Sequence, residues 1–214
     1  MKESFDEEDI EDENKNKNEI NILILGDKKV GKTSLTSKYT KNDYFTNGKY
    51  KLVLPGLNRG EKTIEKNGKK YKLILTDLPP QISYKSFNYK YNGVMLVYDI
   101  TQIDSIVYIS DLIYYLREKN GKNFPMILLG NKVDNEKERC VDEEFGKNFA
   151  DENYIDFFEI SCEKGTNLDI AVDTIFNKIL KVLELDKSDD KKDDSCCCDC
   201  CCRCFHWGKS YPKR

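Results

Sequence analysis

A short segment rich in glycine and lysine follows the first apolar run of the chain. After INILIL comes GDKKVGKT, which fits the pattern G-x-x-x-x-G-K-[ST] between an expected strand and an expected helix. Backbone amides and the helix N-terminus of such a loop face phosphate groups, Lys32 can reach the β- and γ-phosphates, and Thr33 can offer its hydroxyl to Mg²⁺. The pattern therefore predicts a nucleotide phosphate site made of Gly26, Asp27, Lys28, Lys29, Val30, Gly31, Lys32, Thr33 and Ser34.

A second polar segment, Asn131-Lys132-Val133-Asp134, follows the apolar run PMILLG. A carboxylate at Asp134 can accept hydrogen bonds from N1–H and the exocyclic amino group of guanine, whereas adenine offers neither donor and leaves polar groups unpaired. The Lys132 stem can cover the face of a base, and Asn131 can hydrogen-bond the base or brace the phosphate loop. Ser161-Cys162 ends the next apolar run, where a backbone N–H could meet the guanine oxygen. The spacing predicts a guanine site.

These segments need a scaffold, and the alternation of short β-rich runs with longer amphipathic runs predicts an α/β sheet with crossover helices. Asn67-Gly68 lies between two β-like stretches within residues 64–72, which predicts a hairpin and hence a mixed sheet. We expect strands at Ile20 to Leu25, Tyr71 to Thr76, Val94 to Asp99, Met126 to Leu129 and Phe157 to Ile160.

Two amphipathic runs predict helices with one apolar face each. The first covers Asp104 to Lys119, and the second lies near the end of the body. We interpret both faces as core: Ile106, Ile109, Ile113 and Leu116 in the first, and Leu168, Val172, Ile175, Ile179 and Val182 in the second.

Composition sets the organisation of the 214 residues. The charged stretch 1–18 predicts a disordered extension, residues 19–185 predict one folded domain, and residues 186–214 predict a flexible tail. A net charge of −3 and a pI near 5.5 argue against nucleic acid as a partner. No apolar run reaches the roughly 20 residues of a membrane-spanning helix, so we expect a soluble, cytoplasmic chain.

With GDKKVGKTS, LLGNKVD and EISCEK in this order, the chain resembles a small GTPase of the Ras superfamily, and GVMLVYDIT with the C-terminal cysteines points to the Rab branch. The resemblance covers residues 19–185. It implies a P-loop GTPase fold, the Ras-like G domain, with a six-stranded mixed sheet flanked by about five helices. It also implies GTP or GDP with Mg²⁺, effector and exchange-factor partners, and a role in vesicle or membrane trafficking.

Individual residues carry the resemblance further. Tyr44 matches the aromatic residue that covers guanine, and Asp77 matches the aspartate that supports Mg²⁺ through water. Gln81 stands at the position of the catalytic, water-orienting glutamine. The base-binding motifs match at Asn131, Lys132, Asp134, Ser161, Cys162 and Glu163, where Cys162 and Glu163 replace the usual Ala and Lys.

Two loops depart from the family. Leu54-Pro55-Gly56 stands where a Thr should close on Mg²⁺ and the γ-phosphate, and Pro80 stands where a Gly should donate its amide, which proline lacks. The long side chains of Lys28 and Lys29 can obstruct an attacking water. We therefore expect slow or impaired GTP hydrolysis, with a pseudo-GTPase scaffold as the alternative.

The tail holds seven of the nine cysteines: Cys196, Cys197, Cys198, Cys200, Cys201, Cys202 and Cys204. Ten residues follow Cys204, so neither a terminal Cys-Cys nor a C-a-a-X prenylation box is present. Acylation would anchor the chain to the cytosolic face of an intracellular membrane. Metal binding by the thiolates with His206, and an unmodified tail, remain the alternatives.

Overall fold

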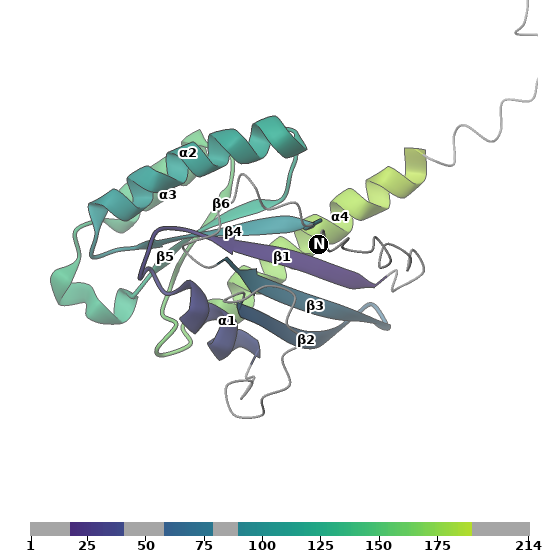
Figure 1. The fold of residues 1–214 in the computed structure, drawn as a ribbon, viewed down its shortest axis with the longest axis horizontal. Helices are drawn as coiled ribbons and strands as arrows, with labels where there is room; N and C mark the ends of the chain where they lie inside the picture. The colour runs from purple at the N-terminus through teal and green to yellow at the C-terminus, as the bar shows by residue number, and fades with distance from the viewer. Residues whose placement is uncertain (1–17, 41–57, 79–89, 190–214) are drawn as a thin grey trace, which may run out of the picture. The chain divides into compact units, whose positions relative to one another are not determined.

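The structure is a computed structural model, and it describes residues 18–40, 58–78 and 90–189. The chain divides into two compact units, residues 1–179 and residues 180–214. The described elements run in the order β1 (Glu19–Leu25), α1 (Lys32–Thr40), β2 (Asn58–Lys66), β3 (Lys69–Asp77), β4 (Gly93–Asp99), α2 (Ile103–Asn120), β5 (Met126–Asn131), the 3-10 helix η2 (Val133–Glu138), α3 (Glu143–Glu152), β6 (Asp156–Ile160) and α4 (Leu168–Asp189) (Figure 1).

The six strands form one mixed sheet in the order β2-β3-β1-β4-β5-β6. Every neighbouring pair is parallel except β2 and β3, which are antiparallel. The predicted α/β fold with a six-stranded mixed sheet flanked by about five helices is thus confirmed, with four α-helices and η2 among the described residues. Because the parallel strands point the same way, the segments that follow β1, β4, β5 and β6 meet at one edge of the sheet.

The hairpin turn is where the sequence predicts it. Asn67 and Gly68 both have positive φ, 53° and 71°, the conformation that a two-residue turn between twisted strands requires. The ladder extends without interruption from Lys66↔Lys69 at the turn to Asn58↔Asp77 at the far end. The turn therefore fixes which residue of β2 lies opposite the carboxyl end of β3.

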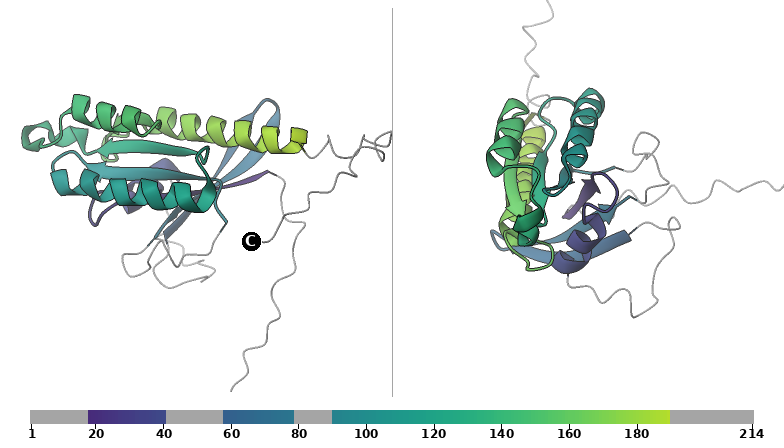
Figure 2. Two further views of the ribbon diagram at one scale, coloured as in Figure 1. Left: turned by 90° about the horizontal axis from the view of Figure 1, so that it is seen from above. Right: turned by 90° about the vertical axis from the view of Figure 1, so that its left-hand side faces the viewer.

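Helices cover both sides of the sheet (Figure 2), because the central strands are apolar on both faces. All seven residues of β4 are buried. On one side, the predicted apolar face of α2 packs with Leu23, Leu96 and Leu128, and Ala150 of α3 joins this core. On the other side, the Phe176 ring of α4 meets the Tyr71 ring edge to face, with 5.3 Å between centroids.

Eight of the nine predicted core positions are buried in the structure: Ile106, Ile109, Ile113 and Leu116 in α2, and Leu168, Val172, Ile175 and Ile179 in α4. The prediction was wrong for Val182, which is only half-buried. Within the described residues, no helix combines the length and the hydropathy that crossing a bilayer requires. The predicted extension 1–18 and tail 186–214, including all seven tail cysteines, lie outside the described residues apart from Asn18 and the end of α4.

Candidate nucleotide-binding site

The loop between β1 and α1 has the backbone that its glycines permit. Gly31 has a φ of 102°, and a Cβ at this position would lie 2.2 Å from Nδ2 of Asn131. Gly26 has a φ of 154°, and its Cβ would lie 2.1 Å from the carbonyl oxygen of Val97. Lys29, with a φ of 62°, completes the turn. The first hydrogen bond of α1, from Leu35 N to Gly31 O at 2.9 Å, places the helix N-terminus directly after the loop.

The loop wraps around the amine of Lys32. Its Nζ donates to the carbonyl oxygens of Gly26 at 3.1 Å and of Asp27 at 2.6 Å. Burial lowers the pKa of Lys32, while the carboxylates of Asp77 and Asp27 oppose this shift. The amine is therefore held at the mouth of the loop, where a phosphate chain bound by the loop amides would meet it.

The hydroxyl of Thr33 donates to Oδ2 of Asp77 at 2.6 Å, although the two residues are 44 positions apart. Burial raises the pKa of Asp77, and hydrogen bonds from Thr33 and Asn58 and the charge of Lys32 oppose the rise. Oδ1 of Asp77 is buried and has no hydrogen-bond partner in the described part of the chain. A hydroxyl oxygen beside a carboxylate oxygen that lacks a partner fits Mg²⁺, which prefers oxygen ligands and retains several waters.

Asn131 joins the phosphate loop to the segment after β6. Its Nδ2 donates to the carbonyl oxygen of Val30 at 2.8 Å, and its Oδ1 accepts from the backbone N–H of Cys162 at 3.1 Å. Of the two roles predicted for Asn131, the structure shows the bracing contact. The Cys162 amide, predicted to meet a guanine oxygen, donates to Asn131 here.

Asp134 lies half-buried at the start of η2, beside the segment after β6. The Ser161 hydroxyl donates to its Oδ1, and Ser161 Oγ in turn accepts the backbone N–H of Lys164 at 3.0 Å. This hydrogen bond from Ser161 is the main cause that lowers the pKa of Asp134. The carboxylate thus stays ionised at neutral pH and acts as an acceptor, the state that recognition of the two guanine donors requires.

Lys132 is held by a buried carboxylate that the sequence did not single out. Its Nζ lies 2.5 Å from Oδ2 of Asp99, whose side chain is 1% exposed. Oδ1 of Asp99 accepts the backbone N–H and the hydroxyl of Thr101 at 2.9 and 2.7 Å. Asp99 ends β4 opposite Asn131 in the ladder, so strand pairing sets its position beside the base segment.

We expect Asp99→Asn to speed GDP release about tenfold, because Lys132 loses the charged partner that fixes its stem, a contact of roughly 1.4 kcal/mol. Displacement of a fluorescent GDP analogue by excess GDP measures the rate. Thr101→Val is the matched control, since it removes one hydrogen bond from Oδ1 and leaves the charge pair. An unchanged release rate in a variant with normal urea unfolding would show that Asp99 does not act on Lys132.

The remaining predicted site residues differ in exposure, and four predicted or altered positions lie outside the described part of the chain. Lys28, Lys29, Thr33 and Ser34 are exposed at the loop and the start of α1, and Glu163 is exposed with its carbonyl oxygen accepting Lys38 Nζ at 2.8 Å. Burial raises the pKa of Cys162 to about 12, so this thiol stays protonated. Tyr44, Leu54, Pro80 and Gln81 lie outside the described residues.

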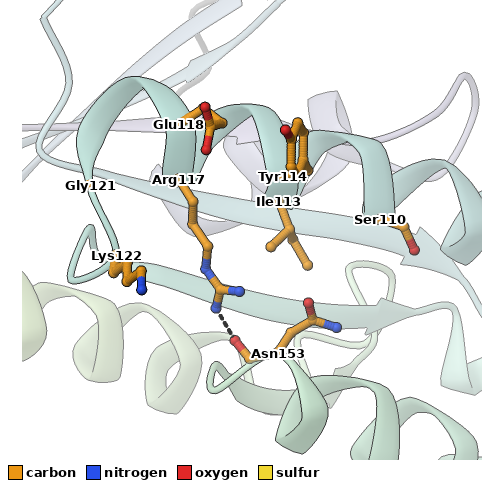
Figure 3. Close-up of a pocket in the computed structure, with 8 residues that line it drawn as sticks. All are labelled: Ser110, Ile113, Tyr114, Arg117, Glu118, Gly121, Lys122 and Asn153. Atoms are coloured by element: carbon orange, nitrogen blue, oxygen red, sulfur yellow. Dashed lines mark hydrogen bonds between the residues drawn. The ribbon is translucent and has the colours of Figure 1, made fainter.

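A separate surface pocket of about 390 Å³ lies at the opposite end of the sheet (Figure 3). Its lining includes Gly121 and Lys122, shortly before β5, and Asn153, shortly before β6. The Arg117 guanidinium crosses it and donates to the carbonyl oxygen of Asn153. None of the predicted nucleotide-binding residues lines this pocket.

Comparison with known proteins agrees with this geometry. A sequence model described as the Ras family matches residues 21–181. The chain belongs to the Ras family. Ras-related protein Rab-11B of Dictyostelium discoideum is 32% identical over 171 residues, 78% of this chain and 76% of that protein. Ras-related protein Rab-3C of Bos taurus is 33% identical over 173 residues, 77% of this chain and 75% of that protein. Ras-related protein RABA2b of Arabidopsis thaliana is 28% identical over 166 residues, 76% of each chain.

Within the Ras family, these relatives confirm the predicted resemblance to a Rab-like small GTPase. The matched residues 21–181 contain the phosphate loop, Asp77, the Asn131–Asp134 segment and Ser161-Cys162. The family match therefore covers every described residue of the candidate site.

Proposed function

We propose that this Rab-like chain binds GDP and GTP with Mg²⁺, selects guanine, and hydrolyses GTP slowly. The observation that carries the proposal is the double contact of Asn131, which links Val30 of the phosphate loop to Cys162 of the base segment. Three motifs spread over about 130 positions thus act as one site. A structural protein without a nucleotide gives no reason for this juxtaposition.

Each described residue has a task in that site. The loop amides and Lys32 bind the phosphates, and Asp134, aligned by Ser161, accepts from guanine. The stem of Lys132, whose amine is paired with Asp99, would cover the base. Thr33 and Asp77 would hold Mg²⁺, the first through its hydroxyl and the second through water. Bound there, Mg²⁺ neutralises charge on the phosphate oxygens.

The residues expected to promote hydrolysis are altered. Leu54 brings no hydroxyl to the metal, and Pro80 brings no N–H to the γ-phosphate. The side chains of Lys28 and Lys29 are exposed in the phosphate loop and could obstruct the water that must attack in line. Gln81 remains as the water-orienting candidate, but two prolines precede it. These changes support slow turnover.

The same changes support a second candidate, a pseudo-GTPase that binds nucleotide and partners without switching. In a switching GTPase, contacts made only by the γ-phosphate order two loops and so separate the GTP state from the GDP state. Leu54 and Pro80 remove one such contact from each loop. The two candidates share the binding site and differ in hydrolysis.

Single-turnover hydrolysis of GTP preloaded on the full chain separates the candidates. We expect slow release of phosphate that depends on Mg²⁺, and little difference in hydrogen exchange of residues 44–60 and 77–92 between GDP and a GTP analogue. Pro80→Gly combined with Leu54→Thr should restore part of that difference, whereas either change alone should restore little. If the GTP analogue strongly protects residues 44–60 and 77–92 of the wild-type chain and GDP does not, switching is not impaired. If the chain does not hydrolyse GTP at all, the pseudo-GTPase scaffold is favoured.

We further propose that the chain acts on the cytosolic face of an intracellular membrane, in vesicle trafficking, with effector and exchange-factor proteins as partners. The resemblance to Rab proteins and the cysteine cluster support this role. Several acyl chains on the tail cysteines would supply the multiple signals that stable anchoring requires. The negative net charge still argues against nucleic acid as a partner.

A further inference from the structure

Asn58 is the first residue of β2 and lies opposite Asp77, the last residue of β3. The uninterrupted hairpin ladder sets this register, so Asn58 is held against the carboxyl end of β3 by backbone pairing alone. Asparagine is depleted in strands, because its amide competes with the backbone for hydrogen bonds. The hairpin therefore gives no reason of its own for an asparagine here.

The amide of Asn58 reaches the two side chains expected to hold Mg²⁺. Its Nδ2 lies 3.3 Å from Oγ1 of Thr33 and 3.4 Å from Oδ2 of Asp77. The Thr33 hydroxyl also donates to the same Oδ2 at 2.6 Å. The three side chains close a triangle, although they come from α1, β2 and β3.

The hydrogen-bonding capacity of this triangle leaves two oxygen sites open. A hydroxyl has one donor and two acceptor lone pairs, so Thr33 donates to Asp77, accepts from Asn58, and keeps one lone pair. Asp77 receives both donors on Oδ2, and its buried Oδ1 has no hydrogen-bond partner in the described chain. Those two sites are the ones a cation and its water would use.

The chemical type of Asn58 suits this task better than its alternatives. An aspartate there would set a second carboxylate against Asp77 and repel it, and a lysine would place a cation where Mg²⁺ binds. A neutral amide donates to both neighbours without changing the net charge of the site. The arrangement gains importance because Leu54 stands where the family has a threonine ligand.

We propose that Asn58 is a positioning residue for Mg²⁺: its amide orients the Thr33 hydroxyl toward Asp77 and leaves one oxygen site on each open to the metal and its water. This proposal rests on the proposed function, since it assumes a nucleotide held with Mg²⁺. It concerns the affinity for the metal and not the selection of guanine, because Asn58 touches neither Lys132 nor Asp134 in any contact that the structure shows.

The test is the release of a fluorescent GDP analogue from the full chain across a range of Mg²⁺ concentrations. We expect Asn58→Ala to raise the half-saturating Mg²⁺ concentration about tenfold, as loss of one hydrogen bond to a charged group predicts. Release in excess EDTA should stay at the wild-type rate. Thr63→Ala, at an exposed position of the same strand, is the matched control and should change neither the half-saturating Mg²⁺ concentration nor the release rate in EDTA.

A double variant shows whether Asn58 acts through Thr33. If it does, adding Asn58→Ala to Thr33→Val should shift the half-saturating Mg²⁺ concentration no further. Three results would overturn the proposal. The shifts of Asn58→Ala and Thr33→Val could add in the double variant, Asn58→Ala could speed GDP release equally in EDTA, or its half-saturating Mg²⁺ concentration could stay within about twofold of wild type. If Asn58→Ala fails to fold, Asn58→Ser, which keeps a shorter donor, is measured in its place and should give a smaller shift in the same direction. A wild-type chain whose GDP release ignores Mg²⁺ would instead refute the proposed function.

Discussion

Lys32→Ala is expected to abolish tight binding of GDP and GTP. The Lys32 amine is the cation that the phosphate loop encloses, held by the carbonyl oxygens of Gly26 and Asp27. Its contacts to phosphate would be charge-assisted, so their loss should weaken binding by more than about a hundredfold, or roughly 3 kcal/mol. Equilibrium titration with a fluorescent GDP analogue measures the change.

Lys119→Ala provides the control for general loss of charge, because Lys119 is exposed in the last turn of α2. It should bind GDP as the wild-type chain does. Urea unfolding without nucleotide checks that Lys32→Ala is folded, since the two carbonyl oxygens lose only their contacts to Nζ. GDP affinity equal to wild type in a folded Lys32→Ala variant would mean that the loop does not bind phosphate.

The sequence predicts the residues that directly follow apolar strands. Lys32 lies in the segment after β1, Asn131 ends β5, and Ser161 follows β6. Because these strands are parallel, the three residues come together at the carboxyl ends of the strands. The Asn67-Gly68 turn is equally local, because its positive φ angles require those residue types. Such features depend on a few neighbouring residues and can be inferred without a structure.

Contacts that depend on register are different. Asn58 is 25 positions from Thr33 and 19 from Asp77, and it reaches both only because the hairpin ladder ends at that pair. Shifting the register by one residue would turn the Asn58 side chain to the other face of the sheet. No residue pattern in the sequence indicates that Asn58 lies opposite Asp77, so Asn58 was not among the predicted site residues.

Asp99 is an intermediate case. It ends the fully buried strand β4 as Asp77 ends β3, but only Asp77 was matched to a residue of the family that the chain resembles. Its partner could not be read from the sequence, because Lys132, which itself has a φ of 74°, reaches Asp99 across the β4–β5 pair. The two buried carboxylates thus lie in different parts of the candidate site, Asp77 beside Thr33 and Asp99 beside Lys132.

Asp134→Ala is expected to remove the preference for guanine over adenine nucleotides. The carboxylate is ionised and aimed by Ser161, and adenine presents no hydrogen at N1 and no amino group beside it to pair with this acceptor. A buried polar group left unpaired costs enough that selectivity should fall by about 2 to 4 kcal/mol, or roughly 30- to 1,000-fold. Competition of a fluorescent GDP analogue by GDP and by ADP gives the ratio directly.

Two further variants locate the origin of that selectivity. Asp111→Ala removes an exposed carboxylate from α2 and should keep the wild-type ratio. Ser161→Ala keeps the Asp134 carboxylate but removes the hydroxyl that aims it, so its ratio should fall between those of Asp134→Ala and wild type. Since ADP shares the phosphates of GDP, its affinity should change little in Asp134→Ala while that of GDP falls. Wild-type protein that binds ADP as tightly as GDP would remove the basis for assigning the Asn131–Asp134 segment to guanine, even with the phosphate loop intact.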